Sequence, residues 1–250
     1  MQATKQEMID RLRQDLMAWE GFRPLPPGER QEFGLGAIEN AFPNQTFPTG
    51  ALHEFISTRP EFTAAIGSFI AGIMQTLLAG GGVCVWVSYS RRIYPPSLKR
   101  FGVNPDRVIF IDVQREKDVL WVTEEALKCS GIAAVICETR LLSFMESRRL
   151  QLAVEQSRVT GFLLRQAPRN PGTVASVARW EIAPLASEAE EGLPGIGFPR
   201  WQVTLHKVRN GRPGSWMVEW SAGRFRFPAP GVAAASPLPA IRAPYKRRTG

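Results

Sequence analysis

The feature that most constrains the fold is a regular alternation of short β-rich runs and helical segments between residues 51 and 165. The runs are rich in Val, Ile and other residues that favour strands. We predict strands at residues 51–56, 83–89, 108–113, 133–138 and 161–165, and helices at 62–79, 96–101, 120–129 and 143–157. This order implies βαβ units, and therefore an α/β protein with a mostly parallel central sheet flanked by helices.

The chain changes character in its last third, where β-rich runs follow one another without helical segments between them. These runs span residues 175–185, 200–209 and 215–227. Asn210-Gly211 lies between the last two runs, and Asn-Gly is a strong signal for a tight hairpin. We therefore expect antiparallel strands at the C-terminal edge of the sheet, within one core that spans residues 49–227.

The segment before this core, residues 1–48, combines an amphipathic helix with an irregular connector. Thr4 and Glu7 have the spacing of a capping box, and the apolar residues that follow recur at helical intervals. These apolar residues are Met8, Leu12, Leu16 and Trp19. The connector at 21–48 is rich in Gly and Pro. The apolar stripe has two interpretations: it binds a groove on a partner protein, or it packs on the chain's own sheet.

The segment after the core, residues 228–250, is rich in Pro, Ala and basic residues and poor in large apolar side chains. We predict a disordered tail because such a composition buries too little apolar surface to fold alone. Lys246, Arg247 and Arg248 contribute to the formal net charge of +8. This excess is compatible with weak or indirect contact with DNA.

The apolar stretch at 62–78 is interrupted by polar and small residues, and the first residues carry no apolar export signal. Cys84, Cys129 and Cys137 lack the spacing of a metal site or of a disulfide framework. We expect a cytoplasmic protein with reduced thiols, no metal ion and no membrane span.

The first predicted strand leads into a loop and a helix, which is where nucleoside triphosphatases place their phosphate-binding loop. That loop requires glycines, then Lys, then Ser or Thr for Mg²⁺. The corresponding stretch, residues 55–64, has neither Gly nor Lys, and Pro60 removes a backbone donor. The degenerate loop consists of Ser57, Thr58, Arg59, Glu61 and Thr63. We expect no nucleotide cofactor and no catalysis, although the charge of Arg59 leaves weak anion binding open.

Glu138 ends the strand predicted at 133–138, at the position where such enzymes place the Asp that orients Mg²⁺. It has the right charge but is not the usual residue. The alternative interpretation is a carboxylate that faces solvent or pairs with Arg140.

Several motifs between residues 50 and 227 resemble the core of RecA, the bacterial recombinase. The similar stretches are 98–108, which leads into the third strand; 161–166, which matches the RecA strand that ends in the nucleotide-sensing Asn-Gln but has Arg165 in place of the Asn; 175–180, which matches the strand after the DNA-binding loop; and 203–209, which matches a Lys-containing strand. The resemblance implies a RecA-like core and makes Gln166 the sensor-like residue.

The chain departs from the RecA pattern at two functional positions. Ser90 stands where the family has its catalytic Glu, so no base would orient an attacking water. The loop between Gln166 and Ala175 is short where the family has a long DNA-binding loop. Arg165 and Arg169 are predicted to be exposed loop cations that either touch a phosphate or remain solvated.

A RecA-like core with a degenerate phosphate loop, an amphipathic first helix and a basic Pro-rich tail resembles the ImuA family. The resemblance implies a non-catalytic accessory protein of SOS-induced, error-prone translesion synthesis. Its partners would be an ImuB-like homologue of the Y-family polymerases, an error-prone polymerase, or RecA itself. Two other classes stay open: a SulA-type cell-division inhibitor, against which the length argues, and a DNA-dependent ATPase or recombinase, against which the loop argues.

Overall fold

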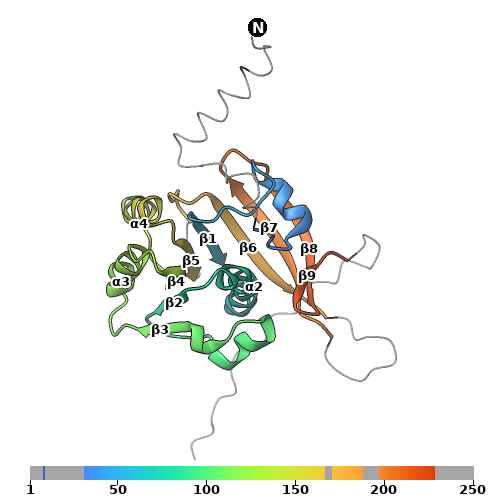
Figure 1. Cartoon of the computed structure of the whole chain (residues 1–250), viewed down its shortest axis with the longest axis horizontal. Coiled ribbons are helices and arrows are strands. Elements are labelled where there is room, and N and C mark those ends of the chain that lie inside the picture. The colour runs from blue at the N-terminus through green and yellow to red at the C-terminus, as the bar shows by residue number, and fades with distance from the viewer. Residues whose placement is uncertain (1–7, 9–30, 167–170, 188–196, 229–250) are drawn as a thin grey trace, which may run out of the picture.

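The computed structural model describes Met8 and residues 31–166, 171–187 and 197–228 (Figure 1). At its centre is a nine-stranded sheet with the order β3-β2-β4-β5-β1-β6-β7-β8-β9. The strands are β1 (Leu52–Ser57), β2 (Val83–Ser88), β3 (Val108–Asp112), β4 (Ile132–Thr139), β5 (Thr160–Gln166), β6 (Ala178–Leu185), β7 (Arg200–Val208), β8 (Gly214–Ser221) and β9 (Arg224–Arg226). Strands β1 to β6 pair in parallel, and β6 to β9 pair antiparallel.

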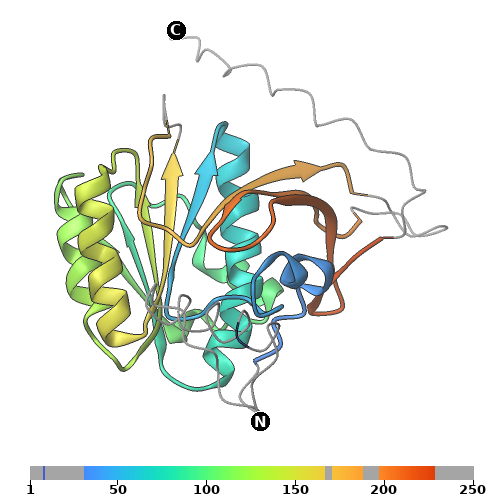
Figure 2. The same cartoon turned by 90° about the horizontal axis from the view of Figure 1, so that it is seen from above.

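Helices cover the two faces of the parallel strands. They are α2 (Pro60–Ala79), α3 (Asp118–Leu127) and α4 (Phe144–Ser157), with the 3₁₀ helices η1 (Gly36–Ala41), η2 (Pro95–Phe101) and η3 (Pro105–Arg107). Helix α2 packs on one face, and α3 and α4 pack on the other (Figure 2). The predicted α/β class, with a mostly parallel sheet and an antiparallel C-terminal edge, is therefore confirmed.

Helix α2 is apolar over nearly its whole length because it crosses the centre of the larger core. By length and composition it could cross a membrane, and it is the one such helix among the described residues. Two thirds of its most apolar window, 67%, is buried inside the protein. Ile66, Phe69, Ile70 and Ile73 pack there against the sheet with no exposed surface. The apolar character of α2 thus serves the core.

The strand predicted at 215–227 is wrong as a single element, because the chain turns back within it. Strand β8 ends at Ser221, and β9 begins at Arg224 and pairs antiparallel with it. Ala222 and Gly223 have φ angles of 52° and 71°, which match the primed turn of a two-residue hairpin. Strands β7 and β8 pair antiparallel as predicted, but residues 209–213 join them, so the connection is longer than a two-residue Asn-Gly turn. Asn210 has a φ of 55°, whereas Gly211 does not have a positive φ.

The part of the connector at 31–48 that the structure describes contributes large side chains to the core. Phe33, Leu35, Ile38, Phe42 and Phe47 are all buried in the cluster that contains α2. Residues 9–30 and 229–250 lie outside the described residues, so the predicted first helix and the predicted disordered tail are not described here.

Beneath this connector lies His53, a buried histidine of β1. Its ring stacks on Phe47 with 4.3 Å between the ring centroids. Its Nε2 lies 2.7 Å from the carbonyl oxygen of Pro48, and its Nδ1 lies 3.3 Å from the indole Nε1 of Trp180. A neutral ring that donates from Nε2 and accepts at Nδ1 satisfies both contacts. Burial lowers the pKa of His53 to about 4, against a smaller opposing effect of the Pro48 carbonyl.

Candidate functional site

The connection between β1 and α2 occupies the position of a phosphate-binding loop. Strand β1 ends at Ser57 and α2 begins at Pro60, so only Thr58 and Arg59 join them. A phosphate-binding loop needs several residues here to wrap a polyphosphate with backbone N–H groups. This connection is therefore too short to form that cradle, in addition to lacking its glycines and lysine.

Hydroxyl groups close the space beneath this connection. The Ser57 Oγ donates to the carbonyl oxygen of Arg59 at 2.8 Å, and it lies 2.8 Å from the Thr63 Oγ1. Because the single Ser57 proton serves Arg59, Thr63 is the donor in the second bond. Both hydroxyls are buried. Ser57 and Thr63 thus hold the first turn of α2 against the end of β1.

The charged residues of the predicted loop do not converge on an anion. Arg59 is exposed, and its guanidinium carbon lies 5.9 Å from the centroid of the Phe62 ring. Glu61 lies in the first turn of α2, where a carboxylate complements the helix dipole. A bound anion would meet this negative charge at the helix end that otherwise favours anions.

Glu138 neither faces solvent nor pairs with Arg140; its carboxylate is buried and accepts hydrogen bonds from two other side chains. Its Oε1 accepts a hydrogen bond from the Trp86 Nε1 at 2.6 Å, and its Oε2 accepts one from the Gln166 Nε2 at 3.0 Å. The expected solvent-facing position or pairing with Arg140 is therefore wrong, since the side chain is buried. Burial raises the pKa of Glu138, although the bond from Trp86 opposes this effect.

Gln166 is the sensor-like residue of the sequence comparison, and the structure joins it to Glu138 across neighbouring strands. Both oxygens of Glu138 are then engaged by neutral donors. Sequence reasoning missed Trp86, although an indole in an apolar strand needs a hydrogen-bond acceptor. Among the described residues, no group of three or more His, Cys, Asp or Glu side chains could hold a metal ion.

Ser90, at the position of the family's catalytic Glu, is exposed in the loop after β2. On the neighbouring strand β3, Asp112 lies beside Ser88, the last residue of β2. The Ser88 Oγ donates to its Oδ1 at 3.0 Å, and Arg91 pairs with its Oδ2 at 2.7 Å. Asp112 therefore has two partners already, and it was not identified from the sequence.

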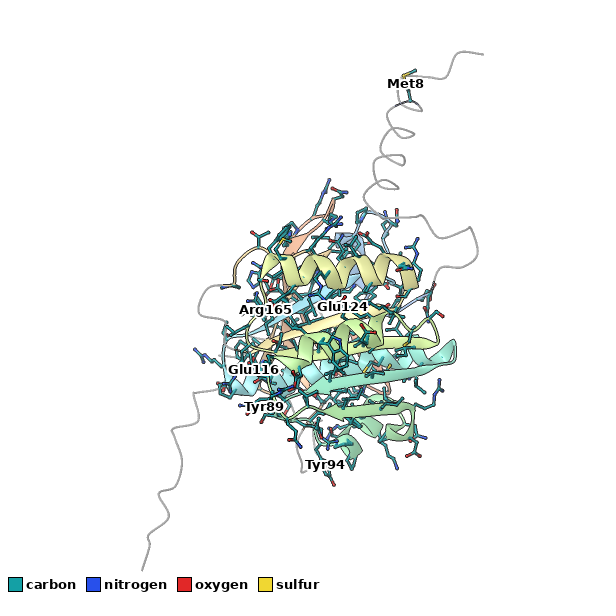
Figure 3. All side chains as sticks on the ribbon, turned by 90° about the vertical axis from the view of Figure 1, so that its left-hand side faces the viewer. Met8, Tyr89, Tyr94, Glu116, Glu124 and Arg165 are labelled. Atoms are coloured by element: carbon teal, nitrogen blue, oxygen red, sulfur yellow. The ribbon has the colours of Figure 1, made fainter. Side chains whose placement is uncertain are left out.

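Arg165 lies on the opposite face of the sheet, under helix α4 (Figure 3). The prediction that it is an exposed loop cation is wrong, because β5 continues through Gln166 and the Arg165 side chain is only 5% exposed. Its Nη1 donates to the Oε1 of Glu54 at 2.7 Å, and the Arg179 Nε donates to the Oε2 of Glu54 at 2.6 Å. A buried carboxylate thus joins β1, β5 and β6.

The other predicted binding residues fall mostly outside the described part of the chain. Met8 is exposed. Outside the described residues lie Leu12, Leu16, Trp19, Arg169, Lys246, Arg247 and Arg248. Cys84 and Cys137 are buried, and burial raises the pKa of each thiol to about 12, whereas Cys129 is exposed.

Known proteins match this chain both in sequence and in structure, although no family model matches it. Protein ImuA of two strains of Caulobacter vibrioides, NA1000 / CB15N and ATCC 19089 / CIP 103742 / CB 15, is 33% identical over 199 residues. The match covers 75% of this chain and 82% of the relative. The crystal structure of the RadB recombinase superposes with a TM-score of 0.55 at 14% identity and covers 78% of this chain and 98% of RadB.

The fold is therefore RecA-like, and only two residues join β1 to α2 at the position of the phosphate loop. The similarity to RadB shows the fold alone, because the sequences have diverged so far. The identity to Protein ImuA, over most of both chains, is decisive for the family. The chain belongs to the ImuA family.

Proposed function

We propose that this protein is a non-catalytic accessory protein of SOS-induced, error-prone translesion DNA synthesis. It recruits or scaffolds an ImuB-like homologue of the Y-family polymerases together with an error-prone polymerase, or it contacts RecA. It does so in the cytoplasm, without a nucleotide cofactor. Membership of the ImuA family supports the cellular process, and the closed loop supports the absence of catalysis.

The observation that carries the non-catalytic part is the two-residue connection between β1 and α2. Phosphoryl transfer depends on positioning and on charge stabilisation around the phosphates. Here the hydroxyls of Ser57 and Thr63 bond each other between the end of β1 and the first turn of α2, and the carboxylate of Glu138 is engaged by Trp86 and Gln166. Of the three catalytic elements of RecA, the phosphate loop is shortened, the catalytic Glu is replaced by Ser90, and the carboxylate at Glu138 is engaged in internal hydrogen bonds.

The proposed binding elements lie outside this closed site. Met8, Leu12, Leu16 and Trp19 would form the apolar face of a helix that enters a groove on the partner. Arg169 and the basic residues of the tail would add weak, salt-sensitive contact with DNA. In this proposal the RecA-like core supports binding surfaces and does not hydrolyse a nucleotide.

A pull-down from cells treated with a DNA-damaging agent tests this proposal. The bait is the full chain, compared with a variant that lacks residues 1–21 and with a matched control that lacks residues 229–250. We expect the full chain and the control to retain the ImuB-like partner, and the variant without residues 1–21 to lose it. Recovery of the tubulin-like division protein instead of a polymerase homologue would favour the SulA-type function.

A further inference from the structure

Large apolar side chains gather on the outer surface of α3 and α4, the two helices that cover one face of the sheet. Apart from Met8, eight large hydrophobic residues of the described chain are exposed, and five of them lie on these helices or in the loop before α4. These five residues, the outer helical face, are Trp121, Leu141, Phe144, Met145 and Leu152. Single exposed hydrophobic residues are ordinary on a protein surface, whereas a cluster of them marks a place where another molecule binds.

Met145 and Leu152 form an apolar stripe along α4. They are seven residues apart, which is two helical turns, so they project from the same side of the helix. They are 70% and 50% exposed. Leu150 and Val154 are buried in the core between α4 and the sheet. Helix α4 is therefore apolar on its outer side as well, where a helix that only covers a sheet is polar.

Trp121 brings α3 into the same surface. It is 63% exposed, and one turn further along α3 the carboxylate of Glu124 pairs with Arg149 of α4. Arg149 lies on α4 between Met145 and Leu152. Figure 3 shows α3 and α4 side by side on the side that faces the viewer, with no other described element over them. The two helices therefore present one outer surface.

The charged side chains of α3 and α4 are all engaged by partners in the same chain. The ion pairs are Arg115–Asp118, Lys128–Glu124, Lys128–Glu125, Arg148–Glu155 and Arg149–Glu124, and Glu146 belongs to the capping box of α4. An acidic partner would find no unpaired cation on these helices. They carry five acids and two bases, although the whole chain has a formal net charge of +8. The positive excess lies elsewhere, so it does not keep two copies apart at this face.

We propose that the outer helical face binds the same face of a second copy of this chain. A two-fold contact brings identical surfaces together, so an apolar stripe meets an apolar stripe. Where two copies of α4 cross antiparallel, Met145 of one copy lies against Leu152 of the other. The other exposed large hydrophobic residues described after Met8 are only Tyr89, Tyr94 and Ile109. A head-to-tail contact would therefore lack an equally apolar counterpart, whereas the two-fold contact closes into a dimer.

The dimensions of the two helices suit a weak dimer. Helices of 10 and 14 residues are about 15 and 21 Å long, and packed helices lie about 8–10 Å apart. The face is therefore roughly 20 Å on each side, which is smaller than the about 800 Å² that a standard interface buries on each partner. We expect a dimer that dissociates at micromolar concentrations. This proposal goes beyond the proposed function and does not depend on the ImuB-like partner.

Sedimentation equilibrium of the full chain from about 1 to about 200 µM tests the dimer. We expect the wild type to pass from monomer to dimer in this range. Met145→Glu/Leu152→Glu places carboxylates in the apolar contact and should weaken the dimer about tenfold or more. Trp121→Ala adds no charge and should weaken it about fivefold. The matched control is Tyr89→Glu/Tyr94→Glu, which adds the same charges at exposed positions outside α3 and α4 and should dimerise as the wild type does.

Several results would overturn the proposal. Circular dichroism checks that each variant is folded, and Trp121→Ala carries the test if the double Glu variant of α4 does not fold. A wild type that stays monomeric over the whole range would contradict the dimer. So would a dimer that persists in the folded α4 and Trp121 variants, or one that the control loses. A monomeric wild type whose variant lacking residues 1–21 dimerises would assign the face to the N-terminal segment instead.

Discussion

Buried polar groups have different partners on the two faces of the central sheet, although adjacent residues of β1 contribute to both faces. On the α2 face, His53, Ser57 and Glu138 each bond neutral groups of the same chain. On the other face, Glu54 binds two arginines, and Lys207 lies opposite one of them. His53 and Glu54 are neighbours in β1, so alternation along the strand places a neutral histidine on one face of the sheet and an ion-paired carboxylate on the other.

The difference shows which polar groups surround the position of the phosphate loop and which lie on the opposite face of the sheet. On the α2 face, the hydroxyls of Ser57 and Thr63 and the carboxylate of Glu138 are engaged in hydrogen bonds within the chain. On the other face, the ion pairs of Glu54 with Arg165 and Arg179 join β1, β5 and β6.

The largest expected effect comes from the charged face, through Glu54→Gln. This change keeps the shape but leaves the buried Arg165 without its counter-charge, and removing one partner of a buried pair costs about 3–5 kcal/mol. Urea unfolding monitored by circular dichroism measures the loss. Glu155→Gln is the matched control, because its pair with Arg148 is partly exposed and should be worth at most about 1 kcal/mol. Similar losses in both variants would show that the Glu54 pair is not a structural charge cluster.

On the α2 face, the buried His53 should make the free energy of unfolding depend on pH. The folded pKa of about 4 lies below the ordinary value of 6.5, so the unfolded chain binds the proton more tightly. The contribution is therefore fully present above about pH 6.5 and is lost as the pH falls toward about pH 4. Between pH 7.5 and pH 5 the wild type should lose about 2 kcal/mol from this residue.

The free energy of unfolding of the wild type and of His53→Phe, measured at pH 7.5 and at pH 5, isolates the contribution of His53. Other groups, such as Glu39 and Glu138 with their raised pKa values, act in both proteins and cancel in the difference. The wild type should lose more stability than the variant on acidification. If the two proteins lose the same amount, His53 is not held neutral by its surroundings.

The smallest effect should come from Ser57→Ala, at the closed connection itself. The change removes the acceptor of Thr63 and the donor to Arg59, at a cost of about 1 kcal/mol. Ser97→Ala, which removes an exposed hydroxyl bond to Tyr94, should cost less than about 0.5 kcal/mol. A Ser57→Ala variant as stable as the wild type would show that these hydroxyls do not hold the connection shut.

Local patterns in the sequence were sufficient to predict the parallel half. Strands β2 and β4 come from the β-rich runs at 83–89 and 133–138, and α4 comes from the helical segment at 143–157. Each of these signals lies within a few neighbouring residues, so it can be recognised without knowledge of the tertiary structure. The missing glycines and lysine of the phosphate loop were readable in the same way.

The charged face could not be predicted because its contacts are distant in sequence. Glu54 and Arg165 are 111 residues apart, and Glu54 and Arg179 are 125 apart. The irregularity that pairs Arg179 with Lys207 depends on the register between β6 and β7, which no local pattern fixes. The turn at Ala222-Gly223 was missed because Ala at a positive φ is uncommon.

The central claim is that the position of the phosphate loop is closed to nucleotides. Isothermal titration of the full chain with ATP and Mg²⁺ tests it most directly, with Arg59→Ala as the paired variant because Arg59 carries the one positive charge in that connection. We predict no binding heat up to millimolar nucleotide for either protein. Micromolar binding by the wild type that Arg59→Ala abolishes would contradict the account.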